Sequence, residues 1–80
     1  MKQEWQIRLE KEFEELGDRI EKLKEFLSDL TNTEKMTTDD WNILCCQRDT
    51  MIAYHGILDY RLIKLGYYKE IEKKLKEINA

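Results

Sequence analysis

The sequence contains no proline, only three glycines and two cysteines, and no long apolar run. With so few of the residues that break helices, the chain can form long uninterrupted helices. The adjacent Cys45 and Cys46 would point about 100° apart on a helix, so they are not placed to bridge each other. No segment reaches the roughly 20 apolar residues of a membrane span, and residues 1–12 lack the apolar core of a signal peptide. We therefore expect a cytoplasmic protein with reduced thiols.

Charged residues are abundant, but the two signs nearly balance, and this balance limits the kinds of partner that the protein can attract. Charged residues make up 39% of the 80 residues, and the formal net charge is only -3 with the signs interspersed. No strong field would attract a long polyanion, so we expect neither long nucleic acid nor a membrane as a partner. A chain of this length forms one domain and buries only about 60% of its unfolded surface. Its core is marginal alone, and we expect a homo-oligomer.

The first half of the chain carries a coiled-coil pattern that predicts a helix over about residues 2–30. Gly17 lies within this helix and is expected to mark a tight helix crossing. Trp5, Arg19 and Phe26 follow a line beside the apolar seam, at the edge of the expected helix contact. The seam itself has steps alternating between four and three residues and consists of Leu9, Phe13, Leu16, Ile20, Leu23, Leu27 and Leu30.

Periodicity is lost over about residues 31–37, which predicts a loop. Thr37 followed by Asp40 resembles a helix cap, so a second helix is expected from about 38 to 65. At Gly66 the apolar stripe changes phase, which predicts a kink or a helix end. Residues 67–79 would then form a short third helix or an extension, with its stripe at Tyr68, Ile71, Leu75 and Ile78. The predicted fold class is an all-α antiparallel helical hairpin with a short C-terminal helical extension, assembling into an oligomeric helix bundle.

Two polar residues interrupt the seam of the second helix. One row of this seam is Leu44, Met51, Leu58 and Leu65, and its companion row is Trp41, Arg48, His55 and Leu62. A buried charge is costly unless it is paired, so Arg48 and His55 require partners. The partner is either a carboxylate or carbonyl within an oligomer, which would fix the register, or an anionic ligand in a cavity between subunits.

A third row on the second helix, Gln47, Tyr54, Arg61 and Tyr68, runs beside this seam. Aromatic faces stack on nucleobases and guanidinium groups hold phosphates, so Tyr54 and Arg61, with Trp5 and Arg8 of the first helix, are candidates for a nucleotide site. Aromatic residues at helix edges also serve interface packing. The sequence has no metal-ligand spacing, glycine-rich phosphate loop or acid/base pair, so we expect no enzyme, no metal and no cofactor.

Two blocks of the sequence resemble a known group of proteins. The first block joins Arg8, Leu9, Glu12 and Leu16 to the segment RIEKLKEFL at residues 19–27. The second block contains Gln47, Met51, Tyr54, Ile57, Leu58, Arg61 and Leu62. Together they are similar to small phage-encoded helical proteins of unassigned function, frequent in tailed and crAss-like phages. The resemblance covers roughly residues 5–62.

This resemblance implies a phage origin and an accessory role. Small oligomeric phage proteins of this design are similar to anti-defence sponges, which bind nucleotide-derived immune signals such as cyclic nucleotides or ADP-ribose derivatives. The expected function is sequestration of such a signal between subunits without catalysis. Tyr54 and Trp5 would stack on the base, Arg61, Arg48 and Arg8 would hold phosphates, and His55 and Gln47 would bond ribose or base edges. The alternative is a non-catalytic adaptor or oligomerisation protein that docks a host or phage protein.

Overall fold

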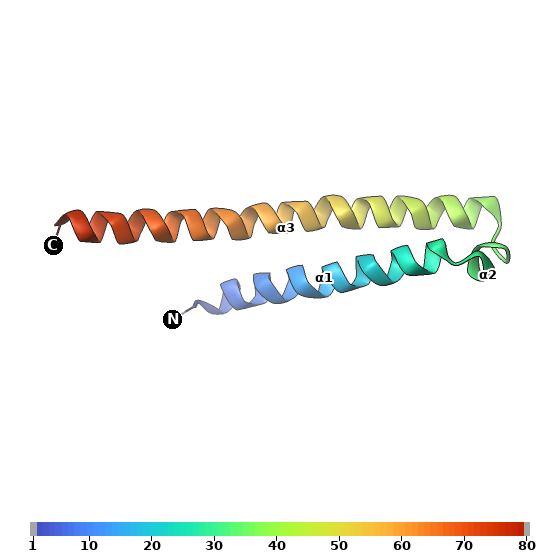
Figure 1. Cartoon of the computed structure of the whole chain (residues 1–80), viewed down its shortest axis with the longest axis horizontal. Helices are drawn as coiled ribbons and strands as arrows, with labels where there is room; N and C mark the ends of the chain where they lie inside the picture. The colour runs from blue at the N-terminus through green and yellow to red at the C-terminus, as the bar shows by residue number, and fades with distance from the viewer. Residues whose placement is uncertain (1, 80) are drawn as a thin grey trace.

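The fold is an all-α antiparallel hairpin, as predicted from the two apolar seams (Figure 1). The structure is a computed structural model that describes residues 2–79, without the side chains of Tyr67, Tyr68, Ile71 and Asn79, so Tyr68 and Ile71 of the predicted C-terminal stripe lie outside the described side chains. Helix α1 spans Glu4–Ser28, the short helix α2 spans Leu30–Thr33, and helix α3 spans Thr38–Asn79. Helices α1 and α3 lie against each other, and α2 forms part of the connection.

Local hydrogen bonds define where α1 begins and ends. Gln3 caps its start, because the Gln3 backbone N–H donates to Gln6 Oε1 at 3.0 Å in a reciprocal capping box. At the other end, Asp29 is extended, and its Oδ1 accepts hydrogen bonds from the backbone N–H and hydroxyl of Thr31 at 2.9 and 2.7 Å. The chain therefore leaves the helix at Asp29. Leu30, predicted as the last seam residue, is consequently 72% exposed, so that part of the prediction is wrong.

Helix α3 begins beside the predicted cap and does not break at Gly66. The hydroxyl of Thr37 accepts a hydrogen bond from the Asp40 backbone N–H at 3.1 Å. The predicted kink or helix end at Gly66 is wrong, because α3 continues through it to Asn79. Gly66 has no positive φ angle, and a single glycine costs a helix only about 1 kcal/mol. Residues 67–79 are therefore an extension of α3.

The core lies along the two predicted seams, where α1 and α3 meet. Leu9, Leu16 and Ile20 of α1 are buried against Leu58 of α3, which has no exposed surface. Partly buried side chains complete this cluster, namely Phe13, Met51, Leu62 and Leu65. The heptad pattern thus predicted correctly which faces of the two helices meet.

The hairpin is elongated. It measures 65 × 18 × 17 Å, and its radius of gyration of 18.9 Å exceeds the roughly 12 Å expected of a compact domain of this length. The C-terminal part of α3 extends past the start of α1 (Figure 1), and Leu75 and Ile78 in this part are exposed. None of the helices within residues 2–79 combines the length and the apolarity needed to cross a membrane.

Candidate functional site at the edge of the hairpin

His55 lies in the seam and contacts α1 through its ring. The imidazole stacks on Phe13 with ring centroids 4.1 Å apart and an angle of 15° between the planes. A Cβ atom added to Gly17 would lie 3.1 Å from His55 Nε2, so the glycine leaves space for the ring. The expected close approach at Gly17 is therefore present, and it accommodates His55 rather than a backbone. His55 is half-buried and acts here as a packing residue.

Arg48 also lies in the seam, but it is not a buried charge. Its side chain is half-buried, and Nε lies 3.1 Å from Oδ1 of the exposed Asp49. Asp49 therefore gives Arg48 a partner on its own helix, and the expected contact of Arg48 with another subunit or a ligand stays a prediction. No polar or charged side chain among the described residues is fully buried. The seam tolerates Arg48 because its charged end reaches solvent.

The edge row of α3 meets the edge line of α1. The Tyr54 hydroxyl donates a hydrogen bond to Glu12 Oε1 at 2.5 Å, across 42 residues of sequence. This hydrogen bond raises the pKa of Tyr54 above its ordinary value of 10.0; desolvation and the charge of Glu12 act in the same direction, whereas Arg61 opposes them. The two lines that the sequence places beside each seam therefore face each other along one side of the hairpin.

Two helical turns further along this edge, Trp5 of α1 and Arg61 of α3 line the same pocket. The pocket has a volume of about 180 Å³ and is completed by Leu9, Lys64 and Leu65. Its lining residues come from the N-terminal part of α1 and the middle of α3, and the ribbons of these two helices diverge toward the N-terminus of the chain (Figure 1). Its floor is apolar and its rim carries two cations beside an exposed indole. Such a combination can hold a planar ring and an attached anionic group.

Lys64 lines the pocket but was not among the binding residues predicted from the sequence. Lys64 lies three residues after Arg61, so the two side chains are neighbours on the surface of α3. Its Nζ is 4.9 Å from the centre of the Tyr60 ring. The spacing of three from Arg61 was the signal that could have identified it.

Two other predicted ligand residues do not line this pocket. Arg8 projects from α1 and forms an exposed pair with Glu4 at 2.5 Å. Gln47 is exposed on the edge row and its Nε2 lies 3.9 Å from Sδ of Met51 on the same helix. Of the seven predicted ligand-binding residues, the structure therefore brings Trp5 and Arg61 together in one pocket, and Tyr54 is the preceding member of the edge row, two helical turns from Arg61.

A second pocket, of about 400 Å³, lies at the turn of the hairpin. Its lining is uncharged and consists of Leu27, Leu30, Thr33, Met36, Thr37, Thr38 and Trp41. It is larger than the pocket at Trp5, but it offers no cationic group to an anionic ligand. In the part of the chain that the structure describes, no three His, Cys, Asp or Glu side chains gather as a metal site would require.

Comparison with known proteins places the chain in a family. A family model described as Sequestin matches residues 3–64, which is more than half of the chain. The chain belongs to the Sequestin family. The family name indicates a sequestering role and specifies no ligand. Neither a curated protein nor a solved structure matches the chain.

The Sequestin match bounds the part of the hairpin that the family shares. It contains all of α1 and α2, and α3 as far as Lys64. The hydrogen-bonded edge at Glu12 and Tyr54 lies inside it, as do four of the five residues that line the pocket at Trp5. The extension of α3 beyond Leu65 lies outside the match. The edge of the hairpin therefore belongs to the part of the chain that the family shares, whereas the extension of α3 does not.

Proposed function

We propose that this protein sequesters a small nucleotide-derived signal, such as a cyclic nucleotide or an ADP-ribose derivative, and does so without catalysis. The observation that carries the proposal is the shared pocket of Trp5, Arg61 and Lys64. The indole would stack on the base, and the two cations would hold phosphate oxygens. The name of the family agrees with sequestration. A phage anti-defence role in a bacterial host is part of the proposal and is supported by the resemblance of the two sequence blocks.

The size of the pocket supports binding between copies of the chain. About 180 Å³ is less than the roughly 300–1,000 Å³ of sites that enclose a whole small ligand. One base would fill the pocket, and the rest of a dinucleotide-sized ligand would stay in solvent unless a second copy covered it. Enclosure between copies would also slow the release of the ligand, as sequestration requires.

The absence of catalysis is part of the proposal. The residues that line the pocket include no carboxylate, imidazole or thiol, which are the common acids, bases and nucleophiles of hydrolases. Glu12, which lies on the same edge of α1 as Trp5, accepts the hydrogen bond of the Tyr54 hydroxyl. A ligand bound at Trp5 should therefore be released unchanged.

The test is binding of a panel of cyclic dinucleotides, cyclic ADP-ribose isomers and ADP-ribose conjugates to the wild-type protein and to two variants. Arg61→Ala should weaken binding at least tenfold, because the phosphate contact is lost. Arg8→Ala is the matched control, since it removes an exposed guanidinium that is paired with Glu4 away from the pocket. Equal affinity of the two variants would exclude this pocket. Recovery of a chemically altered ligand would replace sequestration by catalysis.

The alternative is a non-catalytic adaptor that docks a host or phage protein. The observation that favours it is the uncharged pocket at the hairpin turn, which suits an apolar side chain of a protein partner. A panel in which no nucleotide binds would favour this alternative. Met36→Lys and Trp41→Lys would then abolish docking, whereas Arg61→Ala would not.

A further inference from the structure

The side of α3 that faces away from α1 carries an apolar stripe. Its members recur at alternating steps of three and four residues, so they lie on one face of the helix. All are exposed, including Ile43, Ile57 and Tyr60 at 63, 57 and 58%, and none is charged. We call this the outer stripe, and it consists of Ile43, Cys46, Thr50, Ala53, Ile57 and Tyr60.

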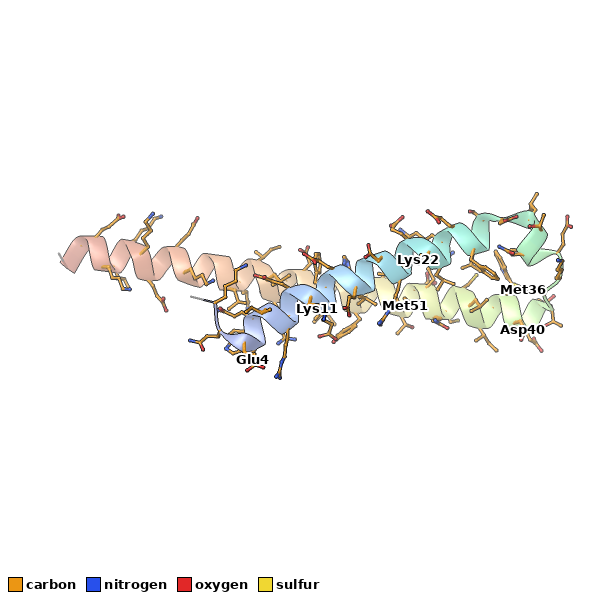
Figure 2. All side chains as sticks on the ribbon, turned by 90° about the horizontal axis from the view of Figure 1, so that it is seen from below. Glu4, Lys11, Lys22, Met36, Asp40 and Met51 are labelled. Carbon is orange, nitrogen blue, oxygen red and sulfur yellow. The ribbon has the colours of Figure 1, made fainter. Side chains whose placement is uncertain are left out.

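The outer face of α1, which is exposed to solvent, is charged along its whole length and serves as a comparison for the outer stripe of α3. Six positions with the same spacing are all charged and exposed, namely Arg8, Lys11, Glu15, Asp18, Lys22 and Glu25. Figure 2, in which α1 crosses in front of α3, labels Lys11 and Lys22 on α1. The two helices pack on the same seam, yet only α1 has an outer side suited to water. The outer stripe of α3 is therefore suited to a protein surface.

The hydroxyl of Thr50 does not oppose burial of the outer stripe. The Thr50 hydroxyl donates a hydrogen bond to the Cys46 carbonyl oxygen at 2.8 Å, so its hydrogen-bonding capacity is used within the helix. Small side chains at positions 46, 50 and 53 allow another helix to approach closely. The larger Ile43, Ile57 and Tyr60 flank them and provide apolar area.

The order of large and small side chains makes the outer stripe complementary to itself. In an antiparallel pair of α3 helices with the two-fold axis between Thr50 and Ala53, Ile57 of each copy lies opposite Cys46 of the other. Thr50 then lies opposite Ala53, and Ile43 opposite Tyr60. A two-fold contact requires such a self-matching surface, because both copies use the same patch. We infer that the outer stripe is the dimer interface and that a second copy of this chain covers it in this register.

The small buried core of the single hairpin favours assembly through the outer stripe. Among the side chains that the structure describes, five apolar ones are buried, namely Leu9, Leu16, Ile20, Leu27 and Leu58. Pairing of the outer stripes would bury a second face of α3 over the roughly 26 Å from Ile43 to Tyr60. Gln47, Tyr54 and Arg61 each directly follow a stripe residue, so the edge row lies between the α1 seam and the dimer interface. The inference concerns assembly alone, and its test needs no ligand.

Cross-linking tests the interface and its register together. In a Cys45→Ala background, Ile57→Cys places a new thiol opposite the natural Cys46 of the other copy. Within one chain these two positions lie about 16 Å apart along the helix axis, so they cannot bridge. Mild oxidation should convert most of the protein to a species of twice the 9.8 kDa chain mass on a non-reducing gel. Cys46→Ala added to this variant should prevent the cross-link.

A second cysteine on the same face controls for non-specific oxidation. Ile43→Cys in a Cys45→Ala, Cys46→Ala background leaves one thiol, which lies opposite Tyr60 of the other copy in the inferred register, so the protein should stay mostly monomeric on the gel. Equal cross-linking of Ile43→Cys and Ile57→Cys would overturn the register. No cross-link with Ile57→Cys would overturn the interface.

Native mass spectrometry of uncross-linked protein gives an independent readout. The wild-type protein should form a dimer. Ile57→Lys should shift the equilibrium to the monomer, while the helix content measured by circular dichroism is retained. Glu15→Gln, which changes the net charge by the same amount at an outer position of α1, should leave the dimer intact. A monomeric wild-type protein, or a dimer that survives Ile57→Lys, would contradict the inference.

Discussion

The hydroxyl of Tyr54 on α3 donates a 2.5 Å hydrogen bond to the Glu12 carboxylate on α1, and this bond joins the two helices at the edge of the hairpin. Arg61, which lines the pocket with Trp5, is the next member of the edge row after Tyr54, and its charge acts on the Tyr54 hydroxyl. The bond requires a protonated phenol, since a tyrosinate would repel Glu12. The edge of the hairpin is therefore sensitive to high pH.

The first prediction concerns this sensitivity. Because the folded state raises the pKa of Tyr54, the contribution of the bond to stability is fully present below pH 10.0 and is lost as the pH rises above that value through the raised pKa. Thermal melts of the wild-type protein should fall more steeply than those of Tyr54→Phe across this range. Parallel pH profiles of the two proteins would show that the bond does not form in solution.

The second prediction concerns the space beside Gly17. Gly17→Leu would push against His55, which the stack on Phe13 holds in place, so we expect a loss of about 1–3 kcal/mol in the free energy of unfolding. Gly66→Ala is the matched control, because no atom lies within 4 Å of the added Cβ. It should stabilise α3 by about 1 kcal/mol. Urea melts followed by circular dichroism measure both, and an unchanged Gly17→Leu midpoint would contradict the close packing.

The third prediction separates packing from chemistry at His55. His55→Leu keeps an apolar side chain against Phe13, so stability should change by less than about 1 kcal/mol. His55→Ala leaves a gap and should cost about 1–2 kcal/mol. Neither variant should weaken binding of a ligand at Trp5 by more than twofold. A tenfold loss of affinity in His55→Leu would show that the imidazole takes part in ligand binding.

The sequence predicted the helix contact well, because heptad spacing determines which faces of two helices can meet. Leu9, Leu16 and Leu58 are buried for that reason. The sequence could not show that Asp29 leaves the helix, since this depends on local hydrogen bonds to Thr31, and Leu30 was consequently misplaced. Gly66 was overinterpreted, because a phase change of the stripe does not require a break in the backbone.

The candidate site was predicted only in part. The pairing of the two edge lines follows from the register of the hairpin, which brings Trp5 to Arg61 and Glu12 to Tyr54. Arg48 and His55 were singled out because a polar residue in an apolar seam is unusual. Half-burial removes that cost, because charged ends can reach solvent and an imidazole can stack on a ring.

The most direct test of the account is calorimetry of the wild-type protein with the nucleotide panel, followed by mass spectrometry of the released ligand. We expect that one class of nucleotide-derived signal binds, that Trp5→Ala and Arg61→Ala each weaken its affinity at least tenfold, and that the ligand is recovered unchanged. Binding that survives both substitutions, or no binding by any member of the panel, would contradict the account.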